Sequence, residues 1–202
     1  QPFFLQEGQN CATPIKSMPG IYRYTIDILI TQVKKAYELG IPAIMLFPFI
    51  DHEKKTECAK EALNKDNLVC RAIKEIKNNL PHIGVITDIA LDPYTSHGHD
   101  GILNQKGVIL NDQTVDILCE QSLIVAEAGC DAVAPSDMMD GRIGKIRNCL
   151  EQNGFHDIQI ISYSAKYSSN FFGPFRDAIG SKNKISNKID KRTYQMDYAN
   201  SK

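Results

Sequence analysis

Short apolar runs alternate with amphipathic stretches along the chain, and the two patterns predict different elements. Runs that are apolar almost without interruption are typical of strands buried on both faces of a parallel sheet. Such runs predict strands near residues 2–5, 43–47, 84–89, 131–134 and 158–162. Each run is followed by a stretch with helical spacing, so the order strand, helix recurs along the sequence.

Helices are predicted where apolar positions recur every three or four residues. The first helix is expected to begin after Thr25 and to end at Gly40. The third is expected to be capped by Asn111 and Asp112 and to end at Gly129. The periodic positions of the four helices are Ile26, Leu29, Val33 and Ala36; Val69, Ala72, Ile73 and Ile76; Val115, Leu118, Ser122 and Val125; and Ile143, Ile146 and Leu150.

Strand–helix units in succession predict an α/β protein with a parallel sheet covered by helices. Doubly wound folds and (β/α)8 TIM barrels both fit this order. No glycine-rich phosphate loop follows the first strand, which argues against a dinucleotide fold. Polar residues follow strands two to five, where a barrel keeps its active site. We therefore expect residues 1–202 to be a partial TIM-barrel catalytic domain with about the first five units and about three strands missing.

Composition narrows the class of protein further. The chain has 202 residues, 43% of them hydrophobic, and a net charge of -1, which suits one domain with a sizeable core. We expect no nucleic-acid partner, because basic residues are not in excess, and no membrane span, because the longest apolar stretch is short. The scattered cysteines favour a reducing compartment over a disulfide framework. The chain opens on Gln1 without a targeting segment, and we expect a natural start to have been lost.

Lys166 is the strongest single candidate for chemistry. It follows the fifth predicted strand, in Tyr163-Ser164-Ala165-Lys166-Tyr167, where a barrel can present an amine to a carbonyl substrate. At an ordinary pKa of about 10.4, only ~1 in 2,500 lysine amines is neutral at pH 7. An apolar pocket or a neighbouring cation would lower that pKa and allow imine formation. The alternative is a lysine that extends from a strand end into solvent.

The segment after the third predicted strand, residues 87–101, is rich in carboxylates and imidazoles. It suits binding of a hard cation or acid–base chemistry, and it includes Asp88. His97 and His99 could form a zinc pair of a hydrolase, but they lie well beyond the strand end, which weakens that interpretation. A structural alternative is that the aspartates form turns around Pro93 and Gly98.

Two further segments carry polar residues beyond strand ends. Ser136 and Asp137 leave the fourth predicted strand, and Asp140 follows where it could cap the next helix. Arg176 lies beside three phenylalanines, which suits a partly apolar pocket that must also hold a carboxylate, although it could equally be a surface residue. The stretch 180–202, with its run of lysines, is expected to be a mobile loop that could close over an anion.

Several segments resemble porphobilinogen synthase, also called 5-aminolaevulinate dehydratase. The resemblance spans essentially the whole chain, with the motifs in order. They are Thr87-Asp88 through Gly101, Val133-Ala134-Pro135-Ser136-Asp137-Met138-Met139-Asp140-Gly141-Arg142, Ser164-Ala165-Lys166-Tyr167, Gly173-Pro174-Phe175-Arg176-Asp177-Ala178 and Thr193-Tyr194-Gln195-Met196-Asp197, with weaker support from Ser17-Met18-Pro19-Gly20 and Leu46-Phe47-Pro48.

The resemblance implies a lyase with an eight-stranded barrel that condenses two 5-aminolaevulinate molecules to porphobilinogen, with loss of two waters. Lys166 matches the first of two imine-forming lysines. Arg176 and Lys191 match cations that grip the substrate carboxylate from an active-site lid, here residues 170–192. The polar groups that line the site in the family are matched by Asp88, Ser136 and Asp137.

Departures from the family pattern bear on the metal. Zinc-dependent members have cysteines where this chain has Ala90, Asp92 and Asp100, although His99 is retained. We therefore expect no catalytic zinc and instead the aspartate-rich branch, with allosteric magnesium held by a ligand outside this chain. The second imine-forming lysine and the N-terminal arm that builds a homo-oligomer, an octamer or hexamer in the full-length family, would also lie outside residues 1–202.

Two other functions stay open at this level. The chain could be another imine-forming barrel lyase, such as a class I aldolase, or an inactive truncated paralogue that acts as a binding or assembly partner. We expect the 202-residue chain by itself to be weakly active or inactive. The composition is compatible with a cytoplasmic protein or, in a eukaryote, with a plastid or apicoplast protein.

Overall fold

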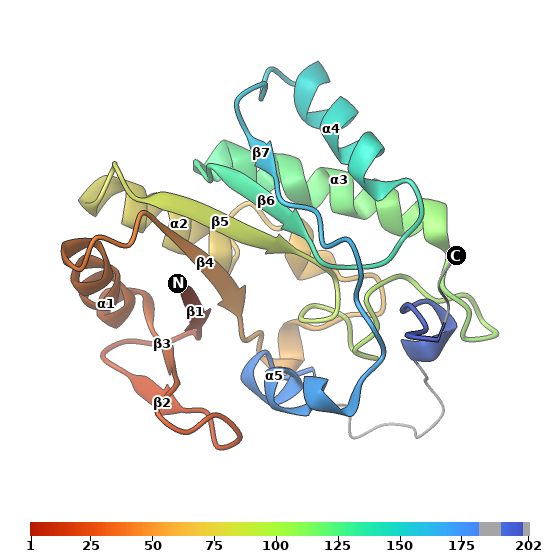
Figure 1. Ribbon diagram of the computed structural model, residues 1–202, viewed down its shortest axis with the longest axis horizontal. Helices are drawn as coiled ribbons and strands as arrows, with labels where there is room; N and C mark the ends of the chain where they lie inside the picture. Colours follow the sequence, from red (N-terminus) through yellow and green to blue (C-terminus); the bar gives the residue numbers. More distant parts are fainter. Residues whose placement is uncertain (182–190, 200–202) are drawn as a thin grey trace.

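A single sheet flanked by helices forms the body of the protein in the computed structural model, which describes residues 1–181 and 191–199 (Figure 1). Within these residues the strands are β1 (Pro2–Leu5), β2 (Ala12–Pro14), β3 (Tyr22–Tyr24), β4 (Ala43–Pro48), β5 (Gly84–Ile89), β6 (Ala132–Pro135) and β7 (Gln159–Ile160). The helices are α1 (Ile26–Glu38), α2 (Leu68–Asn79), α3 (Asn111–Ala128), α4 (Arg142–Gln152) and α5 (Gly173–Ala178), with 3-10 turns at His52–Lys54, Lys60–Leu63, Asn170–Phe172 and Lys191–Thr193.

The strand order in the sheet is β2-β3-β1-β4-β5-β6-β7. All neighbouring pairs are parallel except β2 with β3. From β4 to β7 the strands follow chain order, and helices α1 to α4 lie beside one another in the same order along the sheet (Figure 1). The α/β class and the succession of strand–helix units are thus as expected from the sequence.

The side chains of the strands separate into two layers because successive residues point to opposite faces. Phe3 and Leu5 of β1 belong to the large core between sheet and helices, whereas Phe4 belongs to a second, smaller core. Val85 and Ile89 of β5 face the large core in the same way. Asp88, one residue away from Ile89, therefore faces the inner side of the sheet.

The smaller core attaches α5 to the inner side of the sheet. It consists of Phe4, Ile15, Phe47, Ala178 and Ile179. The guanidinium group of Arg23 supports this contact by donating from Nε to the Ala178 carbonyl oxygen at 2.7 Å and from Nη2 to that of Asp177. The hydroxyl of Ser17 donates to Asp177 Oδ2 at 2.7 Å. α5 is therefore fixed across the ends of β1 and β4.

Some expected boundaries were wrong. The hairpin β2–β3 was not predicted, and the fifth strand is shorter than residues 158–162. Leu110, not Asn111 or Asp112, occupies the N-cap of α3, because the Asn111 amide instead pairs with the backbone of Asp140. Asp140 does not cap α4 either, since Gly141 takes that position with φ +75°.

Part of the expected lid, residues 182–190, lies outside the described residues. The described part of the lid consists of residues 170–181, with α5, and the turn at Lys191–Thr193. Over the part of the chain that the structure describes, none of the helices combines the length and the apolar character needed to span a bilayer.

Candidate active site

A cavity of about 390 Å³ opens at the carboxyl ends of the parallel strands. Asp88 reaches it from β5, Ser136 from the residue after β6, and Lys166 from the segment after β7. Phe172 and Phe175 close it from the side of α5. Parallel strands in register bring these side chains together although they are far apart in the sequence.

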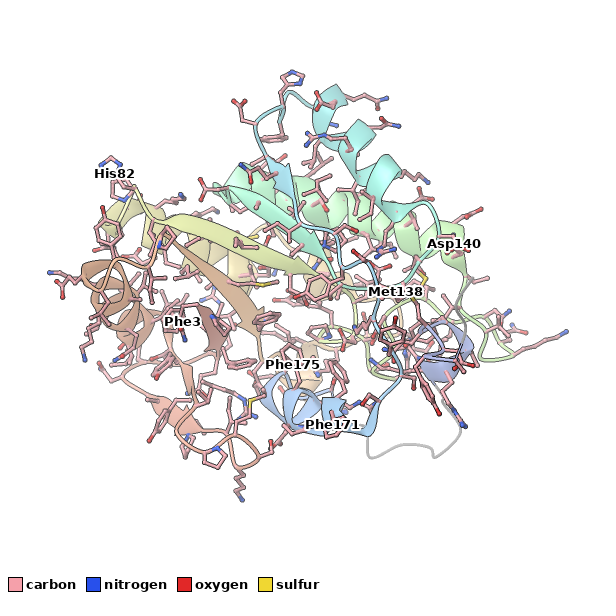
Figure 2. The ribbon with its side chains drawn as sticks, viewed as in Figure 1. Phe3, His82, Met138, Asp140, Phe171 and Phe175 are labelled. Atoms are coloured by element: carbon pink, nitrogen blue, oxygen red, sulfur yellow. The ribbon has the colours of Figure 1, made fainter. Side chains whose placement is uncertain are left out.

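The wall opposite the polar groups is aromatic. Phe172 stacks on Phe175 at 5.3 Å between ring centroids, and Phe175 packs edge-on against Phe47 of β4 at 5.0 Å. Figure 2 shows Phe171 and Phe175 on the same side of the molecule as α5, and Phe171 is exposed at the rim. The cavity therefore joins an apolar wall to a charged one, as suits a small molecule with both a chain and a carboxylate.

The amine of Lys166 is paired with a carboxylate. Its Nζ lies 3.2 Å from Asp100 Oδ2 and 5.2 Å from the ring centroid of Phe172. The side chain of Asp100 is fully buried, and that of Lys166 is 15% exposed. The side-chain amine is thus held between a buried carboxylate and an aromatic face.

Asp100 also binds the turn that follows residue 190. Its Oδ1 accepts from Lys191 Nζ at 2.6 Å, and its Oδ2 accepts from Gln195 Nε2 at 3.5 Å. Lys191 Nζ lies 3.4 Å from Asp92 Oδ2 as well, so one ammonium bridges two carboxylates. The hydroxyl of Tyr194 accepts from the backbone N–H of Asp100 at 3.2 Å. Asp100 therefore connects Lys166 to the described part of the lid.

This arrangement sets the charge of Lys166. Burial works to lower its pKa, but the carboxylates of Asp100, Asp92 and Asp88 outweigh burial and raise the pKa above its ordinary value. Burial opposes ionisation of Asp100, yet Lys166 and Lys191 hold the pKa of Asp100 below its ordinary range. The expectation of a lowered pKa for Lys166 was therefore wrong, because its neighbours are carboxylates rather than cations.

Asp88 and Asp137 differ from Asp100 in having raised pKa values. Burial raises the pKa of Asp88 to about 7, although the Ser136 hydroxyl and the charge of Lys166 work against this. Its Oδ1 is buried without a hydrogen-bond partner among residues 1–181 and 191–199. A carboxyl group that is half protonated near neutral pH can both give and take a proton.

Asp137 plays a different part from Asp88, since it does not line the cavity. Its Oδ1 accepts from the backbone N–H of Met139 at 2.7 Å, and its Oδ2 lies 3.5 Å from Arg142 Nε. Burial raises the pKa of Asp137 to about 6. Figure 2 shows Met138 and Asp140 on this same loop ahead of α4.

Arg176 lies on α5, and its guanidinium carbon is 5.4 Å from the centroid of Phe172. Lys191 Nζ is 5.3 Å from the same ring. With Lys166, three cationic side chains thus surround one aromatic ring. Arg176 Nε is buried and finds no hydrogen-bond partner in the described part of the chain. An unpartnered guanidinium N–H close to the cavity is available to a carboxylate.

The two histidine side chains each make a hydrogen bond within the protein. His99 Nδ1 lies 3.0 Å from the Tyr194 hydroxyl, and His97 Nε2 lies 3.3 Å from the Glu57 carbonyl oxygen. Burial, followed by the neighbouring His97, lowers the pKa of His99 to about 4, so its ring is neutral. No group of three His, Cys, Asp or Glu side chains with metal-binding geometry occurs within the described ranges 1–181 and 191–199.

Comparison with known proteins identifies the family. A family model described as delta-aminolevulinic acid dehydratase matches residues 1–202. The chain belongs to this family.

Related delta-aminolevulinic acid dehydratases match nearly all of this chain. The Bradyrhizobium diazoefficiens protein is 53% identical over 199 residues, which cover 98% of this chain and 56% of the relative. The chloroplastic protein of Oryza sativa is 48% identical over 200 residues, covering 98% of this chain and 46% of the relative. The chain spans about half the length of the curated relatives that it matches.

A solved structure of the family supports the barrel assignment. The dehydratase, or porphobilinogen synthase, of Toxoplasma gondii superposes with a TM-score of 0.93 at 46% identity. The match covers 99% of this chain and 56% of that chain, whose structure contains the reaction product porphobilinogen. The sheet β1 to β7 with its helices is therefore the corresponding part of a dehydratase barrel.

The sequence predicted most residues of the candidate site but not the contacts between them. Lys166, Asp88 and Ser136 line one cavity as predicted, and Arg176 and Lys191 lie beside it. No role was assigned to Tyr194 and Gln195, although both lie in a quoted motif close to Lys191. Asp92 and Asp100 were noted as part of a carboxylate-rich segment and as replacements for cysteine, but no contact with Lys166 was predicted. Their spacing within an acidic segment was the signal that could have predicted a partner for Lys166.

Proposed function

We propose that the protein to which this chain belongs condenses two 5-aminolaevulinate molecules to porphobilinogen, with release of two waters. The observation that carries this proposal is the Lys166 amine, buried in the wall of a cavity that holds both aromatic side chains and carboxyl groups. The family membership supports it. The relative solved with porphobilinogen supports it as well.

In this proposal Lys166 forms a carbon–nitrogen double bond with the ketone carbon of one substrate, and the ketone oxygen leaves as water. Lys166 must first lose a proton, which its pairing with Asp100 opposes. Asp88 lines the same cavity and has a pKa of about 7, so it is suited to pass protons during imine formation. Ser136 lines the same cavity and works against the rise in the Asp88 pKa.

The substrate carboxylate would be held by cations that lie around Phe172. Arg176 brings an unpartnered buried N–H, which suits a charge-assisted hydrogen bond. Lys191 is already bound to Asp92 and Asp100 and would share its charge with the substrate. Closure of the lid around residues 170–192 would then exclude water from the imine.

The metal assignment is part of the same proposal. Asp92 and Asp100 offer hard oxygen donors and no thiolate, a donor set that does not suit a tightly held catalytic zinc. Both carboxylates already contact the Lys191 ammonium. We propose the magnesium-type branch, with the metal held by residues outside this chain and away from the imine.

Because the chain spans about half the length of its relatives, we propose that it is a piece of a longer enzyme. The second imine-forming lysine would come from outside residues 1–202. We propose a homo-oligomer, an octamer or hexamer, as the assembled form. The compartment would be the cytoplasm, or a plastid in a eukaryote, in keeping with chloroplastic relatives.

Trapping the imine tests the function. The full-length enzyme, incubated with 5-aminolaevulinate and then reduced with borohydride, should carry the substrate on Lys166 as a stable amine, located by peptide mass mapping. Lys166→Ala should lose that adduct, and the matched control Lys106→Ala, at an exposed loop position, should keep it. An adduct with a sugar phosphate in place of 5-aminolaevulinate would favour an aldolase. Turnover that is unchanged in Lys166→Ala would overturn the proposal.

A further inference from the structure

A second cavity lies away from the candidate active site. This groove, of about 480 Å³, runs between α3 and α4, and it shares no lining residue with the cavity of Lys166. Figure 1 shows the two helices side by side, and they pack directly against each other. Cys119 of α3 and Cys149 of α4 both line the groove.

An ion pair joins the two helices at the groove. Lys145 Nζ of α4 binds Asp116 Oδ1 of α3. Cys119 follows Asp116 by three residues and Cys149 follows Lys145 by four, so each cysteine lies one turn beyond its member of the ion pair. Both cysteines therefore line the same stretch of the groove, and Cys149 Sγ lies 4.0 Å from the Cys119 carbonyl oxygen.

The two thiols differ in accessibility. Cys119 is 6% exposed, whereas Cys149 is half-buried. Burial raises the pKa of Cys119 to about 12, and the nearby Cys149 thiol adds to the effect. A reagent that enters the groove therefore reaches Cys149 first, and Cys119 stays a protonated thiol until it meets a partner.

We propose that Cys149 and Cys119 form a dithiol modification site, at which Cys149 reacts with a small-molecule disulfide and Cys119 then closes a cross-link between α3 and α4. In the first step the Cys149 sulfur attacks one sulfur of the small disulfide, and the other sulfur leaves as a thiolate that takes up the Cys149 proton. In the second step Cys119 loses its proton and attacks the Cys149 sulfur, which releases the second small thiol. Two protein thiols are oxidised by two electrons, and one small disulfide is reduced to two thiols.

The position of the cross-link connects it to the site loop. α4 begins at Arg142, whose Nε lies 3.5 Å from Asp137 Oδ2 and whose Nη2 donates to the Tyr163 carbonyl oxygen at 2.9 Å. α3 begins at Asn111, which pairs with the backbone of Asp140. A bond between Cys119 and Cys149 would fix both helices that flank the loop from Ser136 to Arg142. The proposed modification site depends only on the packing of α3 against α4, so the cross-link can form without substrate.

Oxidised glutathione is a suitable probe for the full-length, folded enzyme. After incubation at neutral and at mildly alkaline pH, free thiols are alkylated in acid and the protein is mapped by mass spectrometry without reduction. We expect a peptide pair joined through Cys119 and Cys149, with the loss of two hydrogens. The cross-link should close faster at alkaline pH, because Cys119 has to lose a proton.

Single substitutions separate the two steps. Cys119→Ser should stop at a mixed disulfide on Cys149, and Cys149→Ser should leave Cys119 reduced. The control Cys58→Ser removes an exposed cysteine outside the groove and should leave the cross-link intact. The proposal is overturned if the wild-type protein keeps a lasting glutathione adduct on Cys149, or if glutathione attaches to Cys11 and Cys58 while Cys149 stays free.

Discussion

The ion pair between Lys166 and Asp100 decides how readily the candidate nucleophile becomes neutral. An apolar site would lower the pKa of a lysine by desolvation, whereas an opposite charge within about 4–6 Å shifts it by roughly 1–3 units toward the charged form. Here the carboxylates outweigh burial, and the pKa of Lys166 is raised. The resting amine is therefore an ammonium, and binding of substrate has to release it from Asp100.

Replacing Asp100 by Asn should lower the pKa of Lys166, because one paired negative charge is removed. The amount of imine trapped by borohydride in a fixed time should then reach half its maximum at a lower pH, by about 1 unit or more. Asp116→Asn, at an exposed ion pair on α3, is the control and should leave the profile unchanged. A profile of Asp100→Asn that overlies the wild-type profile would show that the ion pair does not set the pKa.

The raised pKa of Asp88 predicts how the stability of the folded protein depends on pH. Its pKa of about 7 lies above the ordinary value of 3.8, so the folded state binds the proton more tightly than the unfolded state does. Below about pH 4 Asp88 is protonated in both states and adds no pH dependence to the free energy of unfolding. Between about pH 4 and 7 the free energy of unfolding falls as the pH rises. From pH 5 to pH 8, wild type should lose about 2–3 kcal/mol through Asp88 alone.

The Asp88→Asn enzyme should lack this part of the pH dependence. The free energy of unfolding of Asp88→Asn, measured by denaturant titration, should therefore rise relative to that of wild type as the pH is raised from 5 to 8. Asp116→Asn again serves as the control, since its side chain is exposed. An unchanged difference between Asp88→Asn and wild type at all pH values would mean that the Asp88 pKa is ordinary.

At the scale of elements, the sequence predicts those that bury an apolar face. β1, β4, β5 and β6 and the helices α1 to α4 were predicted, because apolar runs and helical spacing record which side chains meet the core. The hairpin β2–β3 was not predicted, because its short strands are mostly exposed and therefore show no apolar run. The N-cap of α3 was misassigned because the Asn111 side chain is used in a contact with Asp140 that depends on tertiary structure.

The candidate site could likewise be predicted only in part from the sequence. A side chain that directly follows a strand, such as Ser136 or Lys166, can be placed by the strand alone. The partners of Asp100 cannot, because Lys191 and Gln195 are more than ninety residues further along the chain, in and just after a 3-10 turn. Nor could the sign of the Lys166 pKa shift be predicted, since it depends on which charges lie nearest in space.

Arg23→Ala should loosen α5 while leaving the sheet folded. The substitution removes two hydrogen bonds to the carbonyl oxygens of Asp177 and Ala178, and hydrogen bonds to charged groups contribute about 1.5–3 kcal/mol. Amide hydrogen exchange should become faster over residues 173–180, and the KM for 5-aminolaevulinate should rise because Arg176 lies on α5. Lys65→Ala, which removes an exposed ion pair with Glu127 of α3, should change neither.

At the scale of the whole molecule, the described sheet forms only part of a barrel wall. A barrel active site is assembled from the ends of many strands, so residues supplied by the rest of the wall contribute to turnover. The match to 56% of the Toxoplasma gondii chain shows how much of that architecture residues 1–202 represent. In the proposed mechanism the ends of β5, β6 and β7 would hold one substrate, and the second substrate would need further strands.

The 202-residue chain, assayed by itself, should therefore make little porphobilinogen. Loss of a catalytic residue commonly lowers the rate by two orders of magnitude or more, and in the proposed mechanism the second imine-forming lysine would be such a residue. Steady-state production of porphobilinogen by this chain, compared with the full-length enzyme at equal concentration, measures the difference. Rates within a factor of about two would contradict the proposed division of the site.

The ring of Phe172 lies among three formal positive charges, on Lys166, Arg176 and Lys191. Two negatively charged carboxylates, those of Asp92 and Asp100, contact Lys191 in the described part of the site. Asp88 lines the same cavity with a pKa of about 7, so it adds up to one further negative charge near neutral pH. The cations around Phe172 are therefore nearly balanced before a guest enters, and a carboxylate that binds there has to share them with Asp92 and Asp100.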